Sequence, residues 1–111
     1  MKSMEEMIQA AQQAAETIQK QMEVTQAKLD GLEVEGVSGG GLVKVRATAK
    51  GRVIGVLFDD SLMALSEKGM LEDLIAAAFN DARAKADAVA GAELAKAQQG
   101  MGLPPGFKLP F

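Results

Sequence analysis

Apolar side chains recur at alternating steps of four and three residues through the first third of the chain. This is the heptad spacing of a helix that carries one apolar seam. No proline or glycine falls between Met1 and Asp30, and the residues around the seam are mostly Gln, Glu, Ala and Lys, which favour helix. The pattern therefore predicts a helix over residues 1–30. Its seam consists of Met4, Ile8, Ala11, Ala15, Ile18, Met22, Thr25, Leu29 and Leu32.

A helix of this length measures about 40 Å, whereas a compact domain of about 100 residues has a radius of gyration near 13 Å. The helix must therefore project from its own subunit or pair with something else. One interpretation is an internal hairpin with a second long helix, and the other, which we favour, is a homodimer with helical arms. In the dimer we expect the interface to include Ile8, Ala11, Ala15, Ile18, Met22 and Leu29.

The periodicity changes to two after Leu42, as in a half-buried strand. Apolar residues occupy alternate positions from Val43 to Ala49, with cations and Thr48 between them. The segment RVIGVLF then places Ile54, Val56 and Phe58 on a common face. A two-residue turn at Lys50-Gly51 pairs these three residues with Ala47, Val45 and Val43, all on the apolar side, and a longer loop is the alternative.

A preceding strand is predicted by the same reasoning. If Gly39-Gly40 turns the chain, Val34 faces Val45 and Leu32 faces Ala47, and on the other face Glu35 meets Lys44 and Glu33 meets Arg46. The glycines then serve a hairpin, where a positive φ is cheap for this residue. The result is a three-stranded antiparallel meander in which Lys44 and Arg46 pair with glutamates, while Lys50 and Arg52 at the hairpin tip are the freer cations.

A second long helix is predicted from Met70 to about Gln99, where the chain is rich in alanine. Its buried face is expected to contain Leu71, Leu74, Ile75, Ala78, Phe79, Ala82 and Val89. The fold class is thus α+β: a single domain over residues 1–100 with a long N-terminal helix, the meander and a long C-terminal helix. Residues 101–111 form a separate Pro- and Phe-containing tail, whose Phe107, Leu109 and Phe111 are expected to dock on the core or on a partner.

Several function classes are excluded or disfavoured by composition. The 111 residues include no Cys, His, Trp or Tyr, which removes disulfides, thiolate or imidazole metal sites and histidine-dependent catalysis. The glycines around Gly41 are not followed by the Lys-Ser/Thr of a P-loop, and strand rather than helix follows them, so the dinucleotide fingerprint fails too. We expect no catalytic residues, cofactor or metal. No apolar run is long enough to span a membrane and no secretory signal is present, so we expect a cytoplasmic protein without membrane contact.

Charge is unevenly distributed along the chain. The net charge is −3, yet residues 36–58 contain four basic residues and no acidic residue, and the segments 1–35 and 59–99 each have a net charge of −4. Cations gathered in space can bind phosphates in spite of an acidic total. The distribution therefore keeps polyanion binding open without favouring it strongly.

Three segments resemble the YbaB/EbfC family of bacterial nucleoid-associated proteins: LEVEGVSGGGLVKV (residues 32–45), MLEDLIAAAFNDA (70–82) and GMGLPPGFKLPF (100–111). The resemblance covers nearly the whole chain, in the right order. It implies a homodimer of α-β-β-β-α chains shaped like tweezers, with long helices that project from a shared sheet core and grip double-stranded DNA in the nucleoid. It also implies links to recombination and repair, to gene expression and to recombination or replication proteins, and no catalytic activity.

Candidate DNA contacts follow from placing the cations on these elements. The two predicted arms carry Lys20, Lys28, Arg83, Lys85 and Lys96, and the basic strand segment carries Lys44, Arg46, Lys50 and Arg52. Few side chains suited to reading base edges accompany them, so contacts mainly to phosphates and little sequence preference are expected. The alternative is a protein–protein interaction module that uses the heptad seam and the tail without touching DNA.

Overall fold

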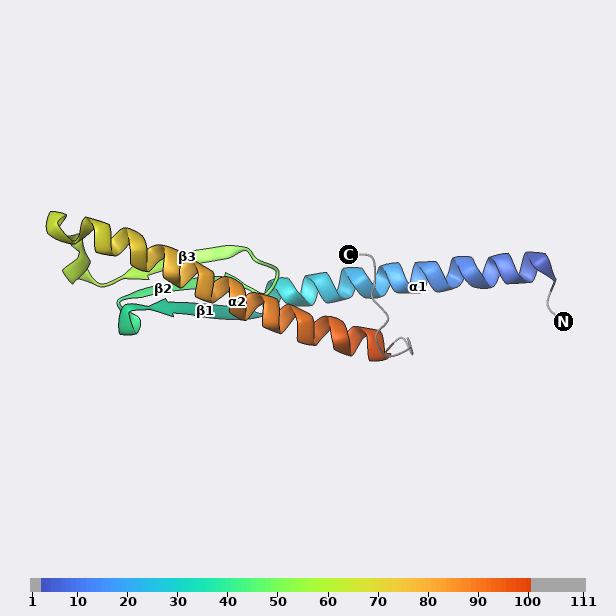
Figure 1. Ribbon diagram of the computed structural model, residues 1–111. Helices are drawn as coiled ribbons and strands as arrows, with labels where there is room; N and C mark the ends of the chain where they lie inside the picture. The colour runs from blue at the N-terminus through green and yellow to red at the C-terminus, as the bar shows by residue number, and fades with distance from the viewer. Residues whose placement is uncertain (1–2, 101–111) are drawn as a thin grey trace.

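The computed structural model describes residues 3–100, and the predicted tail, residues 101–111, lies outside them. Five main elements follow one another in the predicted order: α1 (Met4–Gly31), β1 (Glu33–Ser38), β2 (Val43–Thr48), β3 (Val53–Phe58) and α2 (Lys68–Gly100) (Figure 1). Short 3-10 helices lie at Gly39–Gly41, Asp60–Met63 and Leu65–Glu67. The strands form one antiparallel sheet in the order β1-β2-β3. The predicted α+β class and its meander are confirmed.

Helix α1 extends far beyond the sheet. Ser3 caps its start, because the Ser3 hydroxyl accepts a hydrogen bond from the Glu6 amide at 3.1 Å. Thr25 and Leu29 are its buried residues, so the helix contacts the rest of the subunit through its last turns. The molecule measures 76 × 22 × 17 Å, and most of α1 forms the projecting end in Figure 1.

The register of β1 on β2 differs from the prediction by two residues. Val34 faces Ala47 and Gly36 faces Val45, whereas the sequence pattern placed Val34 opposite Val45. The reason is the length of the connection: Ser38 pairs with Val43, so four residues rather than two turn the chain. The three glycines of this turn have φ values of 61°, 67° and 103°, which confirms why glycine is needed there. A shift of two residues leaves every side chain on its predicted face.

The hairpin between β2 and β3 also departs from the two-residue turn. The amide of Gly51 donates to the Thr48 carbonyl at 2.9 Å, and the Thr48 amide donates to the Arg52 carbonyl at 2.8 Å, so three residues form the loop. Gly51 has a φ of 103°, the left-handed conformation that such a loop requires. The predicted pairs of Val45 with Val56 and Val43 with Phe58 are confirmed. Near the turn the register shifts, and Val53 takes the place opposite Ala47 that was expected for Ile54.

Helix α2 packs on β1 and β2 rather than on β3. The buried core contains Val43, Val45, Leu62, Ala78 and Ala82. Gly36 allows the close approach, since a Cβ at this position would overlap the Ala78 carbonyl oxygen and the backbone of the next helical turn. Phe79 was predicted to be buried, but it is 36% exposed because it points past β2 toward the uncovered β3.

Candidate nucleic-acid interface

Four of the predicted DNA-contacting cations lie in two groups around the end of α1: Lys28 and Lys96 share Glu93, and Arg52 pairs with Asp30, which Lys50 also approaches. Lys28 lies near the end of α1, Lys96 lies in the last turns of α2, Lys50 lies in the turn between β2 and β3, and Arg52 directly follows that turn. Ion pairs with shared acidic partners connect these elements, as described below. We call this group, Lys28, Lys50, Arg52 and Lys96, the junction cluster.

Glu93 joins the two helices of the junction cluster. Its carboxylate lies 2.8 Å from the Lys28 ammonium and 3.4 Å from the Lys96 ammonium, and its side chain is only 13% exposed. The hydrogen bond from Lys28 is the main reason that the pKa of Glu93 is lowered, with a smaller contribution from Lys96. The carboxylate therefore stays ionised at neutral pH and holds both lysines.

Asp30 ties the end of α1 to the β2–β3 turn. The Arg52 guanidinium donates to Asp30 at 3.1 Å, and the Thr48 hydroxyl donates to the same carboxylate at 3.4 Å. The Arg52 hydrogen bond is the largest cause of the lowered pKa of Asp30. Arg52 is therefore an anchored residue, and the prediction that it is one of the freer cations is wrong.

The other predicted cations are spread over the sheet and α2. Arg46 pairs with Glu33 at 2.8 Å, so it does have a glutamate partner on β1, although the pairing is diagonal rather than directly across the strands. On α2, Arg83 pairs with Asp87 at 3.1 Å. Lys85 pairs with an aspartate one turn earlier at 2.9 Å and also donates to a β1 carbonyl at 2.8 Å.

Three predicted cations, Lys20, Lys44 and Lys50, form no ion pair with residues 3–100. Lys44 lies at the end of β2 remote from the junction cluster, so the predicted pairing of Lys44 with Glu35 does not occur. Of the ten lysines and arginines in this part of the chain, seven have an acidic partner. Positive charge available to a ligand is therefore limited by these internal partners.

The opposite end of the molecule is acidic. The connection from β3 to α2 and the first turns of α2 carry Asp59, Asp60, Glu67 and Asp73, none of which is ion-paired within residues 3–100. The pKa of Asp59 is lowered because it accepts hydrogen bonds from Ser61, and Asp59 thereby caps the 3-10 helix at Asp60–Met63. A polyanion is repelled at this end, so the junction cluster is the better candidate for phosphate contact.

The six predicted interface residues of α1 differ in burial within one subunit. Ile8 is 51% exposed, and Ala11 and Ala15 are exposed as well. Ile18 and Met22 are half-buried. Leu29 is 3% exposed and packs within its own subunit, so little of its side chain is left for a partner.

Asp30 and Glu93, which pair with the cations of the junction cluster, were not singled out from the sequence. The ion pair of Glu93 with Lys96 was predictable from the sequence, because residues three apart on a helix are neighbours on its surface. The contact of Glu93 with Lys28 spans most of the chain and follows only from the packing of α1 beside α2. Within residues 3–100 no three acidic side chains lie close enough to bind a metal ion together, and no helix is both long and apolar enough to cross a lipid bilayer.

Comparisons with known proteins cover almost the whole chain. A family model described as the YbaB/EbfC DNA-binding family matches residues 1–101. A nucleoid-associated protein of Rickettsia bellii is 50% identical over 97 residues, which is 87% of this chain and 91% of the relative. A nucleoid-associated protein of Rhodopseudomonas palustris has the same identity and coverage.

A solved structure shows the same fold. The crystal structure of an uncharacterized protein from Helicobacter pylori matches with a TM-score of 0.67 and 23% identity, over 78% of this chain and 89% of that one. At this identity the match supports the arrangement of helices and strands alone.

Proposed function

This chain belongs to the YbaB/EbfC DNA-binding family, and we propose from this premise that it is a non-catalytic, homodimeric, nucleoid-associated protein that contacts mainly phosphates with little sequence specificity. By extension from its relatives' names, it acts in the cytoplasm on the nucleoid. In this role the protein would affect nucleoid organisation, gene expression or recombination and repair. Recombination or replication proteins would be its partners.

The observation that carries the proposal is the junction cluster. Cations from α1, α2 and the β2–β3 turn lie in two groups around the end of α1, next to its projecting part, while the far end of the molecule is acidic. DNA phosphates can approach these cations, because the side chains of Lys28, Arg52 and Lys96 are each at least half exposed. Long flexible ammonium groups suit phosphate contact without base reading.

Homodimerisation is supported by the exposed half of the α1 seam. Apolar residues from Met4 to Ala15 lie on one side of a helix that nothing in residues 3–100 covers. Burying such a stripe against its copy is the usual way that heptad helices remove it from water. Two copies also double the number of junction clusters that a duplex can meet. Light scattering should give about twice the 11.6 kDa mass of one chain, and a folded particle of single mass at micromolar concentration would refute this part.

Salt dependence tests the DNA contact itself. Each phosphate that is neutralised contributes about −0.9 to the slope of log affinity against log salt. We expect a gel shift with duplex DNA at low salt that weakens steeply toward physiological salt and differs little between sequences. Affinity that is independent of salt, or no shift at about 50 mM salt, would contradict the proposal.

A second candidate function, protein–protein interaction without DNA binding, is favoured by the extensive pairing of the cations with acids. In that case the exposed α1 seam and the tail would be the contact surfaces. A chain that ends at Gly100 separates the two candidates: the interaction module loses its partners in a pull-down, whereas the DNA-binding protein retains its gel shift.

A further inference from the structure

The outer edge of β1 carries backbone groups that face away from the rest of the sheet. Strand β1 lies at one side of the sheet, with β2 as its neighbour. The Ala49 amide donates to the Leu32 carbonyl at 2.8 Å, which makes these two residues a hydrogen-bonded pair of the antiparallel ladder. Because such pairs alternate along a ladder, the amides and carbonyls of Glu33, Glu35 and Val37 point away from β2. A row of such groups is the usual template for the addition of another strand.

Two side chains of α2 occupy neighbouring groups of this edge. The Val37 amide donates to the Asp81 carboxylate at 2.9 Å, and the Lys85 ammonium donates to the Glu35 carbonyl at 2.8 Å. Asp81 and Lys85 also pair with each other at 2.9 Å, since they lie one turn apart on α2. The hydrogen bond from Lys85 is the main cause of the lowered pKa of Asp81, followed by the bond from Val37, so the carboxylate stays ionised at neutral pH. We call Asp81 and Lys85 the edge cap.

The edge cap reproduces the hydrogen bonds that an added strand would form. One residue of a parallel strand donates its amide to a carbonyl of the neighbouring strand and accepts from the amide two positions further on. Lys85 supplies this donor for Glu35, and Asp81 supplies the acceptor for Val37. An antiparallel strand is hindered as well, because it needs both the amide and the carbonyl of Glu35 or of Val37. With the edge cap in place, neither kind of strand finds both groups free.

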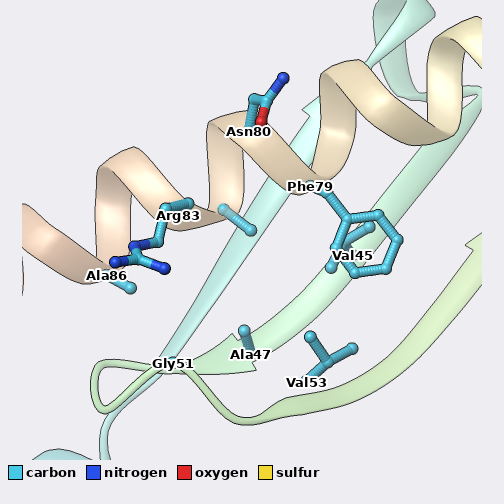
Figure 2. A pocket seen from close by; sticks show the side chains of 9 residues that line it. Val45, Ala47, Gly51, Val53, Phe79, Asn80, Arg83 and Ala86 are labelled. Carbon is cyan, nitrogen blue, oxygen red and sulfur yellow. The ribbon is translucent and has the colours of Figure 1, made fainter.

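The position of α2 places the edge cap at β1. The Ser38 hydroxyl donates to the Leu74 carbonyl at 2.6 Å, and the helix backbone comes close to β1 at Gly36. On the other side of the helix, Figure 2 shows an open space between Phe79 and Val53. Helix α2 therefore closes the edge of the sheet at β1 and not the edge at β3.

We propose that the edge cap prevents β1 from pairing with a strand of another copy of this chain. Subunits whose sheets are open on both sides can pair at both edges, and such contacts repeat into an open-ended assembly. With β1 closed, contacts between sheet edges end after two subunits. This agrees with the proposed homodimer but does not depend on it. Charged side chains and a covering helix are common means by which natural proteins keep an edge strand from pairing with other chains.

Removing the edge cap should let larger assemblies form. In the variant Asp81→Ala, Lys85→Ala we expect light scattering to give species heavier than the wild type, with a mass that increases with protein concentration. Arg83→Ala, Asp87→Ala is the matched control, because this pair has the same charges and the same spacing on α2, but its hydrogen bonds link the two residues only to each other. The wild-type mass for both variants, or equal growth of both, would overturn the proposal.

Amide exchange tests the contact itself in a variant that keeps the charges. Asp81→Lys with Lys85→Asp retains an ion pair one turn apart, but it sets a donor against the Val37 amide and an acceptor against the Glu35 carbonyl. We expect the Val37 amide to exchange about tenfold faster relative to the Ala49 amide, whose bond across the ladder does not involve α2. An unchanged ratio of the two exchange rates would overturn the proposal, whether or not the alanine variant folds. Neither measurement involves DNA, and both compare variants with the wild type, so failure here leaves the proposed DNA binding and homodimer untouched.

Discussion

Glu93 is the residue whose removal should most clearly reveal the cations that bind DNA. Its carboxylate occupies the ammonium groups of both Lys28 and Lys96, at 2.8 Å and 3.4 Å. In Glu93→Gln the shape of the side chain is kept and the charge is lost, so both lysines become available to phosphates. We therefore expect tighter DNA binding together with a steeper dependence on salt.

The size of the change follows from the number of lysines released. Two additional phosphate contacts at one junction steepen the slope of log affinity against log salt by about 1.8. When the salt concentration is lowered from about 200 mM to about 50 mM, each additional phosphate contact increases the affinity by roughly a further 3.5-fold. Two additional contacts therefore increase it by about 12-fold. A dimer that places both junctions on the duplex would show up to about twice the change in slope.

Glu23→Gln is the matched control for this experiment. Glu23 is exposed on α1 and pairs with no cation within residues 3–100, so the substitution changes the net charge equally without releasing a lysine. Gel shifts or fluorescence anisotropy of both variants and the wild type across a salt series give the slopes. Equal slopes for Glu93→Gln and Glu23→Gln would refute the role assigned to the junction cluster.

Three further predictions concern the fold and the dimer. Gly36→Ala should lower the free energy of unfolding by about 1–3 kcal/mol, because a Cβ overlaps the backbone of α2; an unchanged urea midpoint at fixed protein concentration would contradict this. Ile8→Asp should give a folded single subunit in light scattering, whereas Gln13→Asp, on the opposite side of α1, should leave the dimer intact. The pKa values of Asp30 and Glu93 are lower in the folded protein than their ordinary values near 4, so the ion pairs of both carboxylates stabilise the fold at any pH above about 4. This stabilisation is lost as the pH falls through the lowered pKa values. Urea midpoints measured downward from pH 7 should therefore fall less in the double variant Asp30→Asn, Glu93→Gln than in the wild type.

Local patterns were sufficient for the elements and their faces. The heptad spacing around Ile8 predicted α1, the alternation from Val43 predicted β2, and the glycine run before it predicted a turn with positive φ, as the structure confirms. The exact registers were not predictable in this way. A turn of four residues satisfies the same alternation of apolar and polar residues as a turn of two, so sequence periodicity cannot choose between them. The bulge that displaces Ile54 adds one residue to β3 and breaks the alternation, so periodicity does not predict it.

The candidate site was predictable in its cations but not in their partners. The basic residues were evident from the sequence, and so was a likeness to DNA-binding proteins. The pairing of Arg52 with Asp30 and of Lys28 with Glu93 was not, because each contact joins elements that are distant along the chain.

The sequence by itself determined the order of helices and strands, the projecting apolar seam and the supply of basic residues, since each depends on neighbours within a few turns or strand positions. Only the tertiary structure decided which cations are held by acids and which apolar strand is left without cover. Both depend on where α2 lies across the sheet, and its close approach at Gly36 places it over β1 and β2 while β3 remains open.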